Sequence, residues 1–436
     1  MTVAFCLVAM AGAFALIWRG HDVRVVLFAL AMLIASVAGE PEAVFRRTLE
    51  ALTDGKYLLP ICTAMGFAYV VRDAGCVEAL VRLLVRPIVR MPILIVPGSA
   101  AVALVVNSAV GSQTSALAAV GSLLLALMAR LGTPAPLAGA ALIFGASISG
   151  AVANPGVAEV TAASTFTGVP PAEIAVSFVP GVVISFVVGI GVLILMRRLG
   201  VGRTDPALPS TFVVEEDAAT AARAPAAYKA IFPPLPIAWL LFAHPLLPWH
   251  AVIAPVLLGG LEVASAMVVA SALTIVIASP DRQRSIKAFF DGLGYGFAHI
   301  ITIIAVSIGV AKALEVAGVL AAFVELGGGN PLAMLGVSFL LAFGLGALSG
   351  SGTAPSVALI GAMGPHAVEL GVEPLALAGV ILFGAEAGRT TSPVAAVLLF
   401  GSTLVDVPAR VLVLRLWLPC LVGAIAAAAY VAARFQ

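Results

Sequence analysis

The sequence has few charged residues: 23 Lys and Arg and 22 Asp and Glu together make up 10% of its 436 residues. A soluble domain carries about 25% charged residues, so this composition excludes a soluble globular protein. The formal net charge of +1 provides no excess of basic residues for contacts with phosphates. We therefore expect no nucleic-acid partner.

Cysteine and histidine are also scarce, with four and five copies. The spacing of the cysteines matches no metal-binding motif, and we interpret them as small buried apolar residues. The sequence also lacks a Walker motif, a nucleophile elbow and a zinc-protease motif. It therefore predicts that the protein is not an enzyme, and we expect no cofactor other than a sodium ion or a proton used for coupling.

Apolar residues are abundant instead, at 61% of the chain. Long apolar windows recur along its whole length and are interrupted where charges and prolines cluster, which is typical of an all-α, multi-pass membrane protein. In the second half we expect spans at about 228–246, 250–278 and 294–313. A cytoplasmic loop with Arg282, Arg284 and Lys287 is expected to precede the third.

Several short stretches occur twice in the same order. The string GSQT at 111–114 is matched by GSGT at 350–353, which lies 239 residues further on, and IFGA at 143–146 is matched by LFGA at 382–385. The most polar stretch lies between the two sets. We therefore predict an N-terminal repeat over 1–196, a cytoplasmic linker over 197–227 and a C-terminal repeat over 228–436.

The arms that precede the two Gly-Ser-x-Thr stretches differ in charge. The arm at 72–90 is rich in arginine, whereas its counterpart at 314–329 carries Glu315 and Glu325 and no Lys or Arg. Basic residues favour the cytoplasmic side of a membrane, so the two arms are expected on opposite faces. Repeats of inverted topology with interrupted helices are typical of secondary transporters.

The Gly-Ser-x-Thr stretches have two interpretations. Small residues in membrane helices often only allow close helix packing. Their polar, glycine-rich surroundings favour the second interpretation, in which each stretch is the tip of a re-entrant hairpin whose unwound backbone binds an anion or a small cation. The predicted substrate contacts of the tips are Asn107, Ser108, Ser112, Thr114, Ser349, Ser351 and Thr353, and a sodium ion is possible near Gly111, Ser112, Gly350 and Ser351.

A second candidate segment, GAEAGRTTSPV at 384–394, contains Arg389 between apolar flanks. Ionisable residues inside membrane spans are costly and often functional, and arginine can hold a carboxylate with two hydrogen bonds. Arg389 therefore has three interpretations: substrate binding, pairing with Glu386 three residues earlier, or an aqueous interface. The predicted substrate contacts of this segment are Arg389, Thr390, Thr391 and Ser392.

The Asn154-Pro155 and Ser392-Pro393 steps predict breaks in one helix of each half. Glu159 follows the first break, where it either binds a coupling cation or proton or simply faces water. Glu386 is a candidate proton carrier. The predicted coupling-ion residues are Asn154, Glu159 and Glu386.

The chain resembles the C4-dicarboxylate carriers of the DcuC type, within a broader superfamily of ion transporters. The resemblance covers about 57–425 and rests on SGSGTAPSVAL at 349–359, AGRTTSPVAAV at 387–397 and YKAIFPPLPI at 228–237. It implies a carrier of succinate, fumarate or malate in a bacterial inner membrane. It also implies a homodimer in which a transport domain moves like an elevator against a scaffold.

The preferred hypothesis is alternating-access transport of a small dicarboxylate in contact with the lipid bilayer. One alternative is another small organic anion or an amino acid as substrate. Another is a sodium/proton antiporter, for which only Glu159 and Glu386 are available. A membrane-embedded enzyme or an assembly subunit is a third class. It would require a group of His, Asp or nucleophilic residues within the spans, and the sequence shows no such group.

Overall fold

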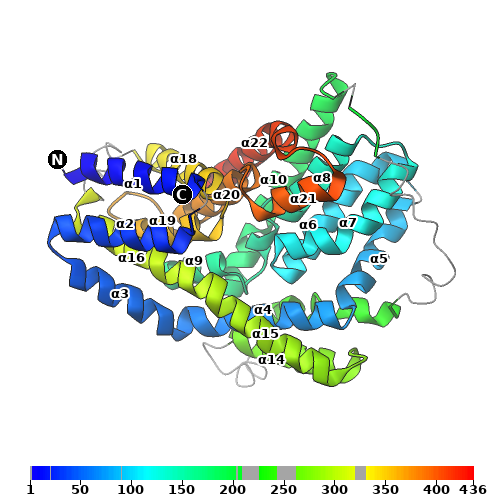
Figure 1. Cartoon of the computed structure of the whole chain (residues 1–436), viewed down its shortest axis with the longest axis horizontal. Helices are drawn as coiled ribbons and strands as arrows, with labels where there is room; N and C mark the ends of the chain where they lie inside the picture. Colours follow the sequence, from blue (N-terminus) through cyan, green and yellow to red (C-terminus); the bar gives the residue numbers. More distant parts are fainter. Residues whose placement is uncertain are drawn as a thin grey trace.

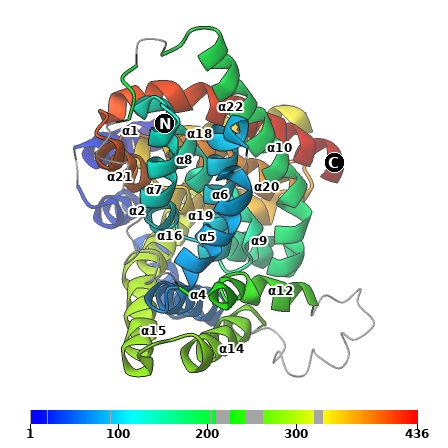
Figure 2. The ribbon, with the colours of Figure 1, turned by 90° about the vertical axis from the view of Figure 1, so that its right-hand side faces the viewer.

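A computed structural model describes residues 2–19, 21–89, 91–202, 205–208, 225–242, 262–319 and 330–436. This part of the chain is almost entirely helical, and its only extended pairing is one isolated bridge between Pro134 and Ala207. Figure 1 shows the helices, and Figure 2 shows α4, α14 and α15, together with α12, in a lower layer.

The helices of the first half follow one another with short connections. They are α1 (Thr2–Trp18), α2 (Val23–Ala38), α3 (Pro41–Thr53), α4 (Gly55–Asp73), α5 (Cys76–Val89), α6 (Ile95–Val110), α7 (Gln113–Arg130), α8 (Ala135–Ser147), α9 (Ala158–Thr167) and α10 (Pro171–Arg198). A short 3-10 helix, η2 (Gly150–Ala153), lies between α8 and α9.

The described helices of the second half begin after the predicted linker. They are η4 (Ala227–Ile231), α12 (Leu235–Phe242), α14 (Glu262–Ile277), α15 (Arg282–Gly296), the π-helical turn η7 (Phe297–Ile301), α16 (Thr302–Val316), α18 (Pro331–Ser349), α19 (Thr353–Met363), η8 (Gly364–His366), α20 (Pro374–Thr390), α21 (Ala396–Val405) and α22 (Ala409–Phe435). Parts of the predicted spans at 228–246 and 250–278 and of the arm at 314–329 lie outside the described residues.

Several helices are long and apolar enough to cross a membrane. Length and composition identify five among the described residues, or six if the bent pair Gln113–Gly121 and Leu123–Arg130 counts as one span. The five are Ala135–Thr167, Pro171–Arg198, Arg282–Val316, Pro331–Ser349 and Ala409–Phe435. The predicted all-α, multi-pass membrane class is therefore confirmed.

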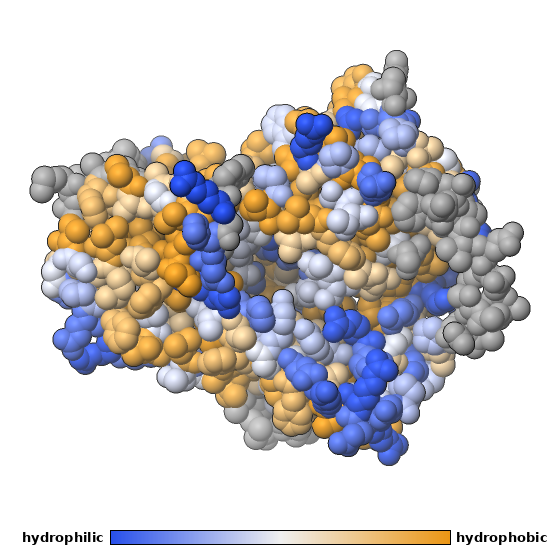
Figure 3. All heavy atoms as spheres, viewed as in Figure 1, coloured by the Kyte–Doolittle hydropathy of each residue, from blue (hydrophilic) through white to orange (hydrophobic). Residues whose placement is uncertain are grey.

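One sequence prediction about the second half is wrong. Residues 282–287, predicted as a loop, form the first turns of α15, because the Asp281 side chain accepts a hydrogen bond from the Arg284 backbone and caps the helix. The helix then continues through η7 into α16. Hydrophilic residues gather at the lower right of Figure 3, where α14 and α15 lie in Figure 1.

Corresponding helices of the two halves begin and end at nearly constant spacing. The starts of α8 and α20 are 239 residues apart, and the starts of α10 and α22 are 238 apart. The glycines that end α6 and α18 have the same left-handed conformation, with φ 67° and ψ 15° at Gly111 and φ 67° and ψ 14° at Gly350. Glycine reaches this conformation without strain, so both Gly-Ser-x-Thr stretches form the same kind of turn.

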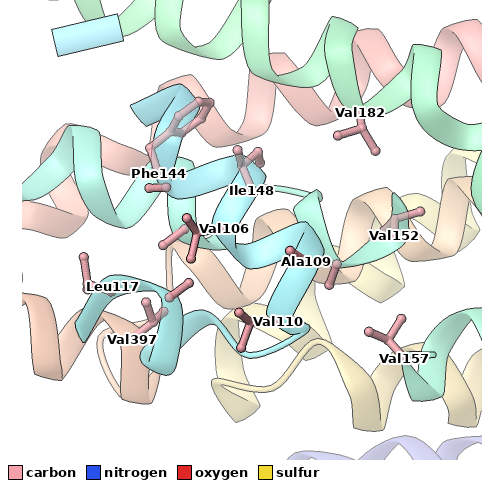
Figure 4. Close-up of a cluster of buried hydrophobic side chains, with 14 of the residues drawn as sticks. Val106, Ala109, Val110, Leu117, Phe144, Ile148, Val152, Val157, Val182 and Val397 are labelled. Atoms are coloured by element: carbon pink, nitrogen blue, oxygen red, sulfur yellow. The ribbon is translucent and has the colours of Figure 1, made fainter. Parts of the chain in front are cut away.

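The helices pack around separate apolar cores. The largest core joins residues of α4 to α10, α12 and α14 with residues of α18 to α22, and Figure 4 shows part of it around Val106, Phe144 and Ile148. A smaller core joins α1 and α2 with α16. A third core packs α4 and α16 against the first turns of α9 and against Val357 of α19. All four cysteines, Cys6, Cys62, Cys76 and Cys420, are buried.

Candidate functional site

The tip of the first hairpin lies between α6 and α7. Gly111 turns the chain, and its N–H donates to the Asn107 carbonyl at 2.7 Å. The Ser108 hydroxyl donates to the carbonyls of Leu104 at 3.0 Å and Gly150 at 2.9 Å, and Ser112 donates to the Ser115 hydroxyl at 3.0 Å. The serine hydroxyls of this tip therefore bond mainly within the protein.

Asn154 connects this tip to the break between α8 and α9. Its amide donates to the Ser108 carbonyl at 2.9 Å and accepts from the Gly156 N–H at 2.8 Å. The backbone bends sharply at Ser149, a non-glycine residue with φ 49°. The predicted break at Asn154-Pro155 thus lies in a non-helical stretch whose geometry is held by neutral hydrogen bonds.

The tip of the second hairpin lies between α18 and α19. Ser349 donates to the Leu345 carbonyl at 2.7 Å, and Ser351 accepts from the Ala354 N–H at 3.3 Å. Thr353, the first residue of α19, donates from its hydroxyl to the Glu159 carboxylate in the first turn of α9. The second tip is therefore bonded directly to the broken helix of the first half.

An ion pair lies at the end of α20, directly before its break from α21. The Arg389 guanidinium donates to the Glu386 carboxylate at 2.5 Å and to the Ser147 carbonyl at 2.9 Å, and the two side chains are only 6% and 1% exposed. The hydroxyls of Thr390 and Ser147 lie 2.8 Å apart. Arg389 thus joins the broken helices of both halves, and the Glu386 pairing that the sequence left open is present.

Glycine makes room for the ion pair at one position of the second tip. A Cβ atom added to Gly352 would lie 2.3 Å from Oε1 of Glu386 and 3.0 Å from Nη1 of Arg389. The corresponding position of the first tip holds Gln113. The second tip therefore packs directly on the ion pair, while the first tip presents an amide side chain.

A cavity of about 80 Å³ lies where the two tips and the first break meet. Its polar lining comes from Gly111, Gln113, Asn154, Gly156, Glu159 and Thr353. Its apolar wall is formed by Ile61, Ala64, Met65 and Phe67 of α4, Met267 of α14 and Ile300 of the π-helical turn. Of the described residues that line it, Glu159 alone is ionisable.

The sequence-predicted residues divide into two groups around this cavity. Gly111, Asn154, Glu159 and Thr353 line it. The other predicted residues do not line the cavity; they are Asn107, Ser108, Ser112, Thr114, Ser349, Gly350, Ser351, Glu386, Arg389, Thr390, Thr391 and Ser392. Within the described residues, both amide atoms of the fully buried Asn107 lack a hydrogen-bond partner. No cluster of three His, Cys, Asp or Glu that could hold a metal is found in the ranges that the structure describes.

Two polar residues of the site were missed from the sequence. Gln113 occupies the variable position of Gly-Ser-x-Thr, and Ser147 ends α8, where it contacts Arg389 and Thr390. The internal match of IFGA with LFGA could have found Ser147, because Ser147 lies 239 residues before Glu386. Gln113 could have been found by comparing the two Gly-Ser-x-Thr stretches, because it is a polar side chain at the position where the second stretch has Gly352.

A sequence model of the DcuC family, the C4-dicarboxylate anaerobic carriers, matches residues 25–436. This chain belongs to the DcuC family. It is also similar to two Haemophilus influenzae proteins, each named as an uncharacterized transporter. Identity is 27% and 32% over 136 residues each; the alignments cover 30% and 31% of this chain, and 94% and 48% of the two relatives.

Membership of the DcuC family confirms the resemblance that the three second-half motifs indicated. Together with the apolar helices, it makes the chain a multi-pass membrane transporter and not an enzyme. The cavity between the two hairpin tips of this DcuC-family protein is therefore the candidate site for its substrate.

Proposed function

We propose that the protein is a secondary carrier of small dicarboxylates such as succinate, fumarate and malate, working by alternating access in a bacterial inner membrane. The observation that carries the proposal is a cavity lined by both hairpin tips and by the first helix break. Family membership supplies the substrate class. A homodimer is part of the proposal and rests on the resemblance alone.

The substrate carboxylates would be held by the two tips, through Ser112, Thr114, Ser351 and Thr353. Of these residues Thr353 lines the cavity, and the other three lie in the same tips outside its lining. Helix amino termini and hydroxyl groups favour an anion, and both α7 and α19 begin at a tip. Arg389 would assist from beside Gly352 of the second tip, because a Cβ atom added to Gly352 would lie 3.0 Å from Nη1 of Arg389.

The charges of the site support cation coupling. Two buried carboxylates, Glu159 and Glu386, accompany one buried arginine, Arg389, so the fully ionised group has a net charge of −1. An entering dianion would be repelled unless protons or sodium ions enter with it. Asn154, Glu159 and Glu386 are the proposed coupling residues, with a sodium ion near Gly111, Ser112, Gly350 and Ser351 as the alternative to a proton.

The proposed motion is that of an elevator built from two inverted repeats. Three observations support it: the matched helix spacing, the equal turns at Gly111 and Gly350, and the position of the cavity against α4. The wall formed by α4, α14 and η7 would belong to the scaffold. The hairpins and broken helices would then move as the transport domain.

The direct test is uptake of labelled succinate by proteoliposomes that contain the purified protein. We expect saturable uptake, competition by fumarate and malate, and strong loss of uptake in Thr353→Ala and Arg389→Ala. The matched controls are Thr403→Ala and Arg282→Ala, at exposed positions outside the site. Wild-type levels in both site variants would remove the site assignment, and uptake that ignores dicarboxylates would remove the substrate class.

A sodium/proton antiporter is the second candidate function, favoured by the two buried carboxylates alone. It would exchange sodium for protons in proteoliposomes without any organic anion. Proton flux measured with a pH-sensitive dye on addition of sodium, with and without succinate, separates the two candidates. Another small organic anion or an amino acid as substrate would be found by competition against labelled succinate.

A further inference from the structure

Glu159 is an unusual residue for an anion-binding cavity. Its side chain lines the cavity and is only 5% exposed. In the described part of the chain its carboxylate takes part in one hydrogen bond, which it accepts from the Thr353 hydroxyl, and in no ion pair. A buried carboxylate with so little compensation is costly, so this contact is a poor means of stabilising the fold.

The nearby arginine makes no hydrogen bond or ion pair with Glu159 among the described residues. Arg389 donates instead to the Glu386 carboxylate and to Ser147. Glu386 Oε1 lies beside Gly352, and neither Glu386 nor Arg389 is among the residues that line the cavity. Glu159 therefore meets the second tip as a carboxylate that contacts a hydroxyl at the start of a helix, which is the contact that a substrate carboxylate needs.

The first tip differs in this respect. Gln113 lines the same cavity at the start of α7, and none of the hydrogen bonds among the described residues involves its side chain. Its amide is therefore open to a ligand. One tip is thus already occupied by a carboxylate of the protein, while the other is free.

We infer that Glu159 is a displaceable internal ligand of the second hairpin tip. Without substrate, the Glu159 carboxylate accepts the hydrogen bond of the Thr353 hydroxyl. A substrate carboxylate replaces Glu159 as the acceptor, while the other end of the substrate contacts the Gln113 amide. This inference rests on the proposed function, because it requires a carboxylate substrate. It predicts that Glu159 competes with the substrate and so lowers the affinity of the resting carrier.

The test compares two variants of Glu159 in full-length protein purified in detergent, with succinate binding measured by calorimetry at fixed pH and salt. Glu159→Gln keeps the shape of the side chain, but its amide oxygen is a weaker hydrogen-bond acceptor than a carboxylate oxygen. Glu159→Asp keeps the charge but withdraws the carboxylate by about 1.5 Å, the length of one carbon–carbon bond. The control is Glu173→Gln, an exposed residue in the first turn of α10.

We expect Kd for succinate to fall about tenfold in Glu159→Gln, which corresponds to about 1.4 kcal/mol, and about threefold in Glu159→Asp. Glu173→Gln should bind like the wild type. Weaker or unchanged binding in Glu159→Gln would overturn the inference, since Glu159 would then be a required ligand or irrelevant. Tighter binding in Glu159→Gln but not in Glu159→Asp would also overturn it, because charge repulsion alone would be acting.

The wild-type measurement separates this inference from the proposed function. If the wild type binds no dicarboxylate and transports none, the proposed substrate class fails. If the wild type binds succinate and the Glu159 variants behave contrary to expectation, the function stands and only the internal ligand fails. Size-exclusion profiles and thermal midpoints of each variant confirm that folded protein is being compared.

Discussion

The helix break of the first half is held by neutral groups, and that of the second half by an ion pair. Asn154 makes two amide hydrogen bonds at 2.8 and 2.9 Å, whereas Arg389 and Glu386 pair at 2.5 Å with almost no exposure. Removing one partner of a buried ion pair leaves an uncompensated charge, while removing a neutral partner leaves only an unsatisfied dipole. The backbone turns of the two halves match, yet we expect substitutions at the two breaks to lower the free energy of unfolding by very different amounts.

The largest effect is expected from Arg389→Met. It would leave the Glu386 carboxylate buried without its partner and lower the free energy of unfolding by about 3–5 kcal/mol. Thermal midpoints in detergent would show the loss. Combining it with Glu386→Gln removes the uncompensated charge and should recover most of the stability. A double variant less stable than Arg389→Met alone would show that the ion pair is not the source of the loss.

A somewhat smaller effect is expected from Gly352→Ala. The added Cβ would lie 2.3 Å from Glu386 Oε1, so the carboxylate must shift, at a cost of about 1–3 kcal/mol for overpacking. Thermal midpoints and succinate uptake should both fall. Gly344→Ala in α18 is the control, because nothing lies within 4 Å of its added Cβ. Equal behaviour of the two variants would contradict the close contact at Gly352.

Asn154→Ala should cost less than Arg389→Met and about as much as Gly352→Ala. It removes two neutral hydrogen bonds, each worth about 1 kcal/mol, and loosens the first tip from the first break. Asn154→Ser can still accept from the Gly156 N–H, so we expect an intermediate thermal midpoint. If Asn154→Ala were as damaging as Arg389→Met, the contrast between a neutral and an ionic break would be lost.

The smallest effect is expected at the first tip, in Ser112→Ala. The lost bond to Ser115 is a half-buried hydroxyl pair at 3.0 Å, worth about 0.5–1 kcal/mol. Ser115→Ala should cost a similar amount, and the double variant should cost no more than one single variant, because all three lose the same bond. Additive losses in denaturation measurements would show that the two hydroxyls act independently.

The places where helices end could be predicted from the sequence. Glycine ends α6 and α18 at the two turns, and the prolines after Asn154 and Ser392 keep those steps non-helical through local backbone preferences, which need no tertiary information. The end of α8 at Ser147 was not predicted. The start of α15 was predicted wrongly because its first residues are polar and charged. Their polar composition favours a loop. The Asp281 side chain nevertheless caps a helix there, and composition alone does not show such a cap.

The partners inside the site could not be predicted in the same way. Whether Arg389 faces a substrate or Glu386 depends on how α8 and α20 approach each other, and the Ser147 contact spans 242 residues of sequence. The bond between Thr353 and Glu159 likewise joins the two halves. Such contacts follow from the packing of distant helices, which the periodicity of one helix does not encode.

The burial of all four cysteines has a practical consequence for watching this transporter move. Thiols at 0–8% exposure react slowly with maleimides, because labelling needs an accessible thiolate. Reporter cysteines introduced at exposed positions, one on α15 and one on α21, would therefore dominate labelling in an otherwise unaltered chain. Fluorescence transfer between two such dyes, followed during succinate addition, would measure the displacement between the layer of α4, α14 and α15 and the broken helices directly.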